Sequence, residues 1–141
     1  MSILVDTAQW PIVQTVWDGE TTVSDVDQYI EQLDGIFGRK ELFLTITWMK
    51  KYSTNGEVRK RISDLMVRHA EAARQYSVCS ALIAPNTAFR FVLSTIFLIK
   101  KMDTPYLVCA NFDEAMKFAR AEADKKKLRL PFKVQPIVTN L

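Results

Sequence analysis

The residues that could do chemistry are few and widely spaced in this chain of 141 residues. There is a single histidine, His69, and its neighbours four residues away on either side, Leu65 and Ala73, are apolar. No cysteine and no second histidine stands at a spacing that would hold a metal ion with it. We therefore expect His69 to be a packing or solvent-facing residue of a helix, and not a catalytic base or metal ligand.

Sequence motifs for nucleophilic catalysis and phosphate binding are also missing. The chain has no Gly-x-Ser-x-Gly elbow, no Gly-x-Gly-x-x-Gly turn and no Gly-Lys-Ser/Thr loop. Its carboxylates gather at predicted helix starts, where the helix dipole favours negative charge. Two carboxylates that are distant in sequence could still meet in the fold. The pattern predicts a protein that is not an enzyme and needs no cofactor or metal.

Cysteine placement and the N-terminus bear on the compartment. Cys79 and Cys109 lie within apolar runs, as expected for buried free thiols, with a disulfide or a reactive thiol as the alternative. The N-terminal sequence MSILVDTAQWP lacks the basic and long apolar regions of a signal peptide. The apolar stretch 88–99 is interrupted by polar residues and is too short to span a bilayer. We therefore expect a cytoplasmic protein.

Charge is mild and mostly scattered. The chain has 19 basic and 16 acidic side chains, a formal net charge of +3. Basic residues cluster at 50–51, 59–61 and 125–127. A nucleic-acid binder usually gathers Lys and Arg on one face, so we expect no nucleic-acid partner. We interpret the clusters as solvated surface, with binding of an anionic partner as the alternative.

Hydrophobic periodicity predicts alternating strands and helices. Strands are expected at 3–5, 12–17, 42–48, 78–84 and 105–110, and helices at about 24–37, 54–76, 86–102 and 111–123. Ser24, a Thr54–Glu57 capping box and Asn111 are the predicted N-terminal caps, and 50–55 is expected to be a loop. The order predicts an α/β fold with a mixed, mostly parallel sheet of about five strands and about four helices. We expect one domain over 1–141, with 128–141 as an extended tail packed on its body.

The helix expected at 88–102, AFRFVLSTIFLIKKM, is apolar almost all the way round. A helix lays one face on a sheet, so its remaining apolar side chains need other cover, and such patches often mark interaction sites. The cover could be a second copy of the chain, another protein, the chain's own tail or a lipid. The predicted interaction surface consists of Phe89, Phe91, Val92, Phe97, Leu98 and Met102.

Residues 86–121 resemble the C-terminal half of small bacterial STAS-like proteins, which share the fold of the anti-sigma-factor antagonists. The residues that carry the resemblance are Arg90, Val92-Leu93, the apolar run 96–99, Pro105, Phe112 and Glu114. The resemblance implies a regulatory domain that acts by protein–protein contact, and we expect it to self-associate. The alternative is a domain of the same fold that binds a small apolar ligand or lipid, with Trp10, Trp17 and Trp48 as pocket residues instead of core.

The same resemblance raises a phosphorylation site. In phosphorylated members a serine at the start of the helix after the central strand is the switch, within an Asp-Ser-Ser/Thr-Gly-like motif. Ser53 and Thr54 stand in that region here, but the preceding Asp is missing and Asn55 separates them from Gly56. This departure favours a helix cap over a phosphosite.

Overall fold

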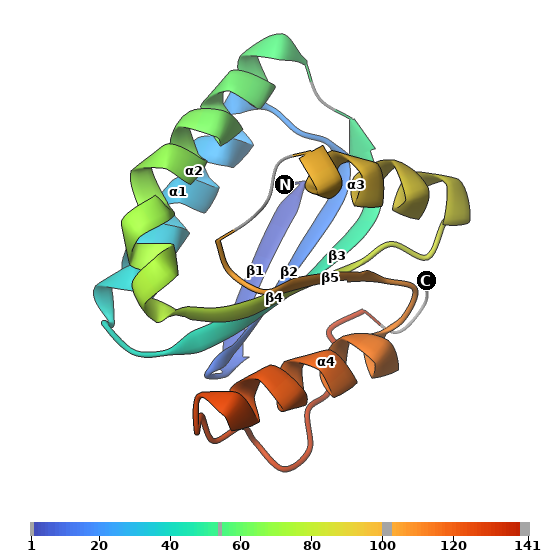
Figure 1. Ribbon diagram of the computed structural model, residues 1–141. Coiled ribbons are helices and arrows are strands. Elements are labelled where there is room, and N and C mark those ends of the chain that lie inside the picture. The colour runs from blue at the N-terminus through green and yellow to red at the C-terminus, as the bar shows by residue number, and fades with distance from the viewer. Residues whose placement is uncertain (1, 54, 100–102, 139–141) are drawn as a thin grey trace.

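The computed structural model describes residues 2–53, 55–99 and 103–138, without the side chains of 51–53 and 96–99. Strands and helices alternate after an initial hairpin (Figure 1). The elements are β1 (Ile3–Gln9), β2 (Ile12–Glu20), α1 (Val23–Gly38), β3 (Phe43–Ser53), α2 (Gly56–Tyr76), β4 (Ser77–Ile83), α3 (Thr87–Ile99), β5 (Tyr106–Cys109) and α4 (Phe112–Lys125).

The five strands form one sheet whose spatial order follows the chain, β1-β2-β3-β4-β5. β1 pairs with β2 antiparallel, while β2, β3, β4 and β5 pair in parallel. The predicted α/β class, five strands and four helices are confirmed. The sheet is best described as mixed rather than mostly parallel, because the hairpin closes one edge with an antiparallel strand.

The helices cover the sheet from both sides. Figure 1 shows α1 and α2 side by side on one face, α4 on the opposite face, and α3 at the end of the sheet where the parallel strands finish. This arrangement follows from crossover connections between neighbouring parallel strands. It places the N-terminus of each helix at the carboxyl end of the strand before it.

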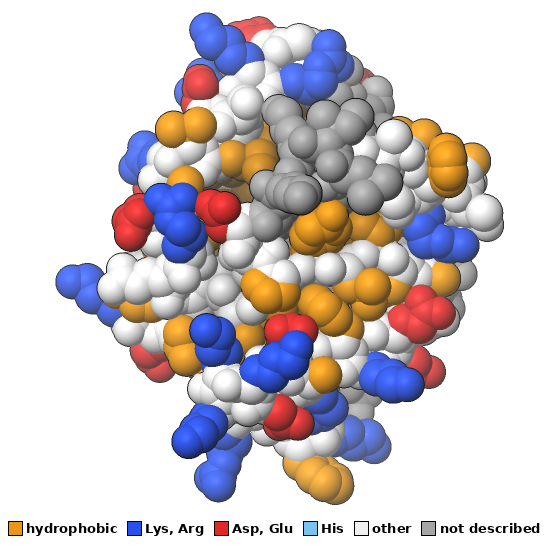
Figure 2. Space-filling view, in the orientation of Figure 1, with side chains coloured by type: hydrophobic (Ala, Val, Ile, Leu, Met, Phe, Trp, Pro, Cys, Tyr) orange, Lys and Arg blue, Asp and Glu red, His pale blue; other side chains and the backbone are white. Residues whose placement is uncertain are grey.

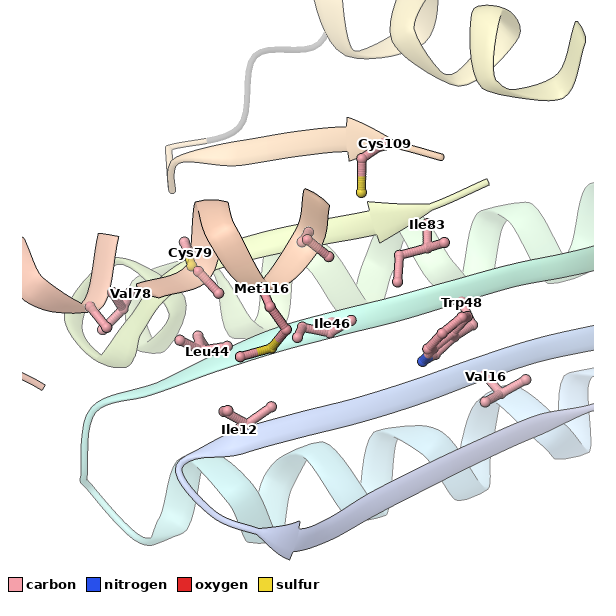
Figure 3. Close-up of a cluster of buried hydrophobic side chains, with 14 residues drawn as sticks. Ile12, Val16, Leu44, Ile46, Trp48, Val78, Cys79, Ile83, Cys109 and Met116 are labelled. Carbon is pink, nitrogen blue, oxygen red and sulfur yellow. The ribbon is translucent and has the colours of Figure 1, made fainter. Parts of the chain in front are cut away.

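The main hydrophobic core lies between the sheet and α4. Met116 reaches down between Leu44 and Ile46 of β3 (Figure 3). The ring of Trp48 stacks on Phe112 at 5.7 Å between centroids. The buried face of α4 consists of Ala115, Met116, Ala119 and Ala123, with Phe112 packed beside them.

Two smaller clusters lie on the other face of the sheet. One, under α3, contains Trp17, Met49 and Leu93, and the ring of Trp17 meets Tyr29 edge-on at 5.3 Å. The other lies beside α1 and joins its side chains to Phe43, on which Trp10 stacks at 5.7 Å. All three tryptophans therefore belong to packed clusters.

Two predicted helix caps are wrong by one or two residues. α1 is capped by Thr22 and not by Ser24, and Thr22 forms a capping box with Asp25. α2 is capped by Asn55, whose side chain accepts a hydrogen bond from the Val58 N–H at 2.9 Å. Several adjacent polar residues can cap a helix, so the sequence leaves the choice open. The cap predicted at Asn111 is confirmed.

The expected loop at 50–55 is wrong over most of its length. β3 continues through residues 50–53 and stays paired with β2 as far as Ser53 opposite Glu20. An ion pair between Lys50 and Asp18, 3.7 Å apart, helps to hold this polar end. On α2, the apolar side chain of Met66 is exposed.

The segment after α4 returns to the sheet. Its apolar residues pack on the core between the sheet and α4; they are Leu128, Leu130, Val134, Ile137 and Val138. Near its end, Gln9 and Gln14 from the hairpin both donate to the backbone oxygen of Gln135 at 2.7 Å. This segment therefore covers the α4 side of the sheet.

Across the part of the chain that the structure describes, none of the helices combines the length and the apolar character needed to cross a bilayer.

Candidate interaction surface

Local hydrogen bonds fix the start of α3. The Asn86 side chain accepts from the Phe89 N–H at 2.9 Å, which satisfies one of the free donors at a helix N-terminus. The Arg90 guanidinium donates to the backbone oxygens of Ala84 at 2.9 Å and Pro85 at 3.4 Å. The one charge in the first half of α3 is thereby turned toward the backbone that enters the helix.

The inner side of α3 seals the end of the sheet. Leu93 is buried and Phe89 is half-buried, and both belong to the cluster that contains Trp17 and Met49. Phe89 was predicted to lie on the interaction surface. Its ring instead packs partly against the chain's own core.

The outer side of α3 is an apolar stripe with helical spacing. Ala88, Phe91, Val92 and Thr95 are all exposed and stand at i, i+3, i+4 and i+7, so they share one face. Phe91 is 73% exposed and Val92 51%. The Thr95 hydroxyl donates to the Phe91 backbone oxygen at 3.0 Å, so its polar group is already bonded within the helix. We name these four residues the α3 stripe.

The remaining predicted members of the surface fall outside the description. The side chains of Phe97 and Leu98 are not described, and neither is Met102. In the described part of α3, Phe91 and Val92 point outward together and Phe89 does not join them. Hydrophobic side chains gather on α3 at one side of the molecule in Figure 2.

The chain's own tail packs elsewhere. Residues 128–138 lie against the cluster beneath α4, whereas α3 packs in the cluster on the other face of the sheet. Within the described residues, the tail therefore leaves Phe91 and Val92 open. Residues 128–138 thus do not supply the cover that the sequence allowed for these two side chains.

The predicted phosphorylation region lies at the junction of β3 and α2. Ser53 is the last residue of β3, and Asn55, two residues later, caps α2. Thr54 lies outside the described residues. The carbonyl of Asn55 also accepts from the Arg59 N–H at 3.0 Å, so the first turn of α2 is formed directly after this junction.

His69 has a partner that sequence reasoning missed. Its Nε2 lies 2.7 Å from Oδ1 of Asp34 on α1, and its ring stacks on Phe37 at 4.9 Å. The other carboxylate oxygen of Asp34 accepts from Arg68 at 2.9 Å. Among the described side chains Nδ1 of His69 has no hydrogen-bond partner and is buried. Asp34 and Phe37 share a face of α1 through their spacing of three, but no local signal pairs that face with His69.

This arrangement joins α1 to α2. Among the described residues, no nucleophilic side chain forms a hydrogen bond with His69. The predicted role as a packing residue agrees with its side chain being only 12% exposed.

Both cysteines are free and buried, as predicted. Burial raises the pKa of Cys79 to about 12, and burial with nearby Glu114 raises the pKa of Cys109 to about 11. Because the thiolate is the reactive form, both thiols are inert at neutral pH. Burial likewise raises the pKa of Tyr29 to about 12.

Two hollows in the described surface are lined largely by charged side chains. One lies by α1 and α2, with Lys60, Arg61 and Asp64 in its lining. The other lies at the end of α4, with Arg120, Asp124 and Lys127. Neither has the apolar lining that a small apolar ligand needs. No group of three His, Cys, Asp or Glu that could hold a metal is present in the described residues.

Comparison with known proteins gives no further assignment. No family model matches the chain, and neither the curated proteins nor the solved structures contain a match.

Proposed function

We propose that this protein is a STAS-like regulatory module that works by binding another protein chain through α3. The observation that carries the proposal is the α3 stripe, in which Phe91 and Val92 are exposed side by side. A soluble domain rarely keeps two large apolar side chains together on a helix face without a partner for them.

The STAS-like part of the proposal is supported by the order of elements. β2, β3 and β4 each lead into a helix and then into the next strand of the sheet, without a change of direction in strand order. The region compared with the phosphorylated serine of the family ends β3 and precedes the first turn of α2. These features agree with the resemblance seen in residues 86–121.

The protein-contact part is supported by the chemistry of the α3 stripe. From residue 91 to 99 the sequence has no charged side chain, and Arg90 is held against backbone oxygens. Burying one Phe side chain is worth about 2 kcal/mol, so Phe91 is suited to be a central anchor. A stable interface buries about 800 Å² on each partner, so residues around the stripe must also take part. Sequence spacing extends the stripe toward Leu98 and Met102.

The first partner to test is a second copy of the chain. Light scattering and sedimentation of the wild type across a concentration series are expected to show a dimer. Phe91→Asp is expected to raise the dissociation constant at least 100-fold, because it places a charge in a desolvated contact. Val67→Asp is the matched control, since Val67 is 78% exposed on α2, away from the stripe, and should leave association unchanged.

A monomer at every concentration shifts the test to a different protein. In that case wild type and Phe91→Asp are compared as bait in a cytoplasmic extract, with Val67→Asp again as control and far-UV circular dichroism as the folding check. A partner captured by wild type and Val67→Asp but not by Phe91→Asp supports the proposal. Equal behaviour of all three proteins in both experiments defeats it.

Phosphorylation at Ser53 or Thr54 belongs to the same proposal. A phosphate at the N-terminus of α2 would add nearly two negative charges where the helix dipole favours them. Intact mass of the protein purified from its native host shows whether the group is present. An unmodified mass in all growth conditions removes this regulation and leaves the α3 contact untouched.

A further inference from the structure

A second unusual surface lies on the opposite side of the sheet, at the end of α4. The chain leaves α4 through Lys126 and turns at Lys127, which has a φ of 57°. It then passes through residues 128–133 before it packs on the sheet. We name residues 126–133 the Phe132 loop.

The apex of this loop is a fully exposed aromatic ring. Phe132 is 100% exposed, although its neighbours Leu130 and Pro131 are half-buried. Full exposure is rare for phenylalanine, because burying the ring is favourable by about 2 kcal/mol. The backbone at this apex is fastened to α4, since Arg120 donates to the backbone oxygens of Phe132 at 3.2 Å and Pro131 at 3.4 Å.

Positive charge surrounds this apex. Residues 117–133 contain seven of the 19 basic side chains and two of the 16 acidic ones, a formal charge of +5 in a chain whose total is +3. Of the two acids, Glu122 is paired with Lys125 at 3.0 Å, and Asp124 lines the adjacent hollow. Figure 2 shows Lys and Arg side chains gathered around the α4 end of the molecule, with hydrophobic atoms projecting among them.

A hollow suited to an anionic group lies beside the apex. It measures about 370 Å³ and opens between the last turns of α4 and the loop. Its basic lining consists of Arg120, Lys127 and Arg129. Asp124 also lines the hollow, which leaves a formal net charge of +2 and favours an anionic group such as phosphate over a neutral molecule.

We propose that the Phe132 loop docks on an anionic lipid surface. Phe132 enters the boundary between headgroups and acyl chains, while the basic side chains bind lipid phosphates. An exposed aromatic side chain surrounded by Lys and Arg can bind a protein to the surface of an anionic bilayer without spanning it.

The shape of the surface favours a lipid over a nucleic acid. Single-stranded nucleic acids bind in grooves where several aromatic rings stack on successive bases. Phe132 is the one aromatic residue in the loop, and it stands at a protruding tip. A tip with a single ring matches insertion into a fluid interface better than stacking along a strand.

The surface is independent of the α3 stripe. The loop lies on the α4 side of the sheet, whereas α3 packs in the cluster on the other face (Figure 1). A copy bound to a membrane through the Phe132 loop therefore keeps its α3 stripe free for a protein partner.

The test is co-sedimentation of the full chain with vesicles. Wild type is expected to bind vesicles of equimolar phosphatidylcholine and phosphatidylglycerol, not pure phosphatidylcholine, and to detach as salt is raised. Phe132→Ser is expected to weaken binding about tenfold, and Phe132→Leu to retain it. Lys127→Gln combined with Arg129→Gln removes two cations and is expected to weaken binding about 30-fold.

Matched controls separate this surface from the rest of the molecule. Val67→Ser removes an exposed apolar side chain from α2, and Lys60→Gln combined with Arg59→Gln removes two exposed cations from the same helix. Both are expected to bind vesicles like wild type. All altered residues are exposed, and thermal melting verifies that each variant folds.

Three results would overturn the proposal. The first is equal binding to neutral and anionic vesicles, or to neither. The second is unchanged binding of both Phe132→Ser and the Lys127/Arg129 variant. The third is binding of a single-stranded oligonucleotide, lost in the Lys127/Arg129 variant, by a protein that does not sediment with anionic vesicles, which would assign the surface to nucleic acid.

Discussion

The side-chain oxygen of Gln14 in β2 accepts a hydrogen bond at 3.0 Å from the backbone N–H of Ile137, 123 residues later in the chain. The amide nitrogen of the same side chain donates to the Gln135 oxygen at 2.7 Å. One buried glutamine thus pairs with two backbone groups of the tail, as a neighbouring strand would. It fastens the tail to the sheet.

Gln14→Ala is expected to destabilise the protein by about 2–3 kcal/mol, because it removes both hydrogen bonds from this buried side chain to the tail and leaves the part-buried Ile137 N–H without that partner. Urea unfolding measures the change, and hydrogen exchange at Ile137 should become much faster. Gln9→Ala is the matched control, since Gln9 also bonds Gln135 but at an exposed position, and should cost less than about 1 kcal/mol. Equal losses for the two variants would show that Gln14 has no special role.

The capping box of α1 predicts a dependence on pH. The pKa of Asp25 is lowered, first by the hydrogen bond from the Thr22 backbone N–H and also by the Ser2 hydroxyl. A carboxyl with a lower pKa in the folded state stabilises the protein above its unfolded pKa. That stability is lost as the pH falls below about 4 and through the folded pKa.

Asp25→Asn is therefore expected to be less stable than wild type at neutral pH, with the difference shrinking in acid. Urea unfolding at a series of pH values measures both curves. Asp64→Asn, at an exposed position on α2, should run parallel to wild type. A constant gap between Asp25→Asn and wild type at every pH would contradict the assignment.

The contact between His69 and Phe37 predicts that His69 links α1 to α2. His69→Ala removes the ring stack and the hydrogen bond to Asp34 and is expected to cost about 2 kcal/mol. Arg68→Ala removes only the exposed bond to the same carboxylate and should cost about 0.5 kcal/mol or less. Thermal unfolding of the two variants compares them, and a larger loss for Arg68→Ala would disprove the ranking.

Burial of the two thiols predicts that Cys79 and Cys109 react slowly with thiol reagents. With the pKa of Cys79 raised to about 12 and that of Cys109 to about 11, almost no thiolate exists near neutral pH. A thiol-specific chromogenic reagent should label neither cysteine in the folded protein and both after unfolding in denaturant. Rapid labelling of one thiol in the native state would show that it is reached by solvent.

The alternation of strands and helices could be predicted because it follows from the local periodicity of apolar residues. The residues at which each strand or helix begins and ends could not. Three hydroxyl residues, Thr21, Thr22 and Ser24, stand around the start of α1, and each residue type is a suitable cap. The polar end of β3 is a strand because β2 pairs with it as far as Ser53, which is a long-range contact. Local propensity at 50–53 carries no trace of that partner.

The surface of α3 shows the same limit. The sequence predicted that its apolar side chains exceed what one face can bury, and Phe91 and Val92 are exposed as that requires. Which residues face inward depends on where the sheet lies. Phe89 and Phe91 are two positions apart, about 200° around the helix, so one packs inward and the other outward. The partnership of Gln14 with the tail had no local signal at all.

The position of α4 and the tail affects the order of events during synthesis. Ile12, Leu44 and Trp48 belong to strands made early, yet the side of the sheet on which they pack is closed by residues 112–138, which emerge later. When a ribosome-bound chain has been synthesised as far as β5, the hydrophobic face of its sheet that α4 and the tail later cover is still exposed. At that stage the nascent chain exposes its largest hydrophobic surface to chaperones.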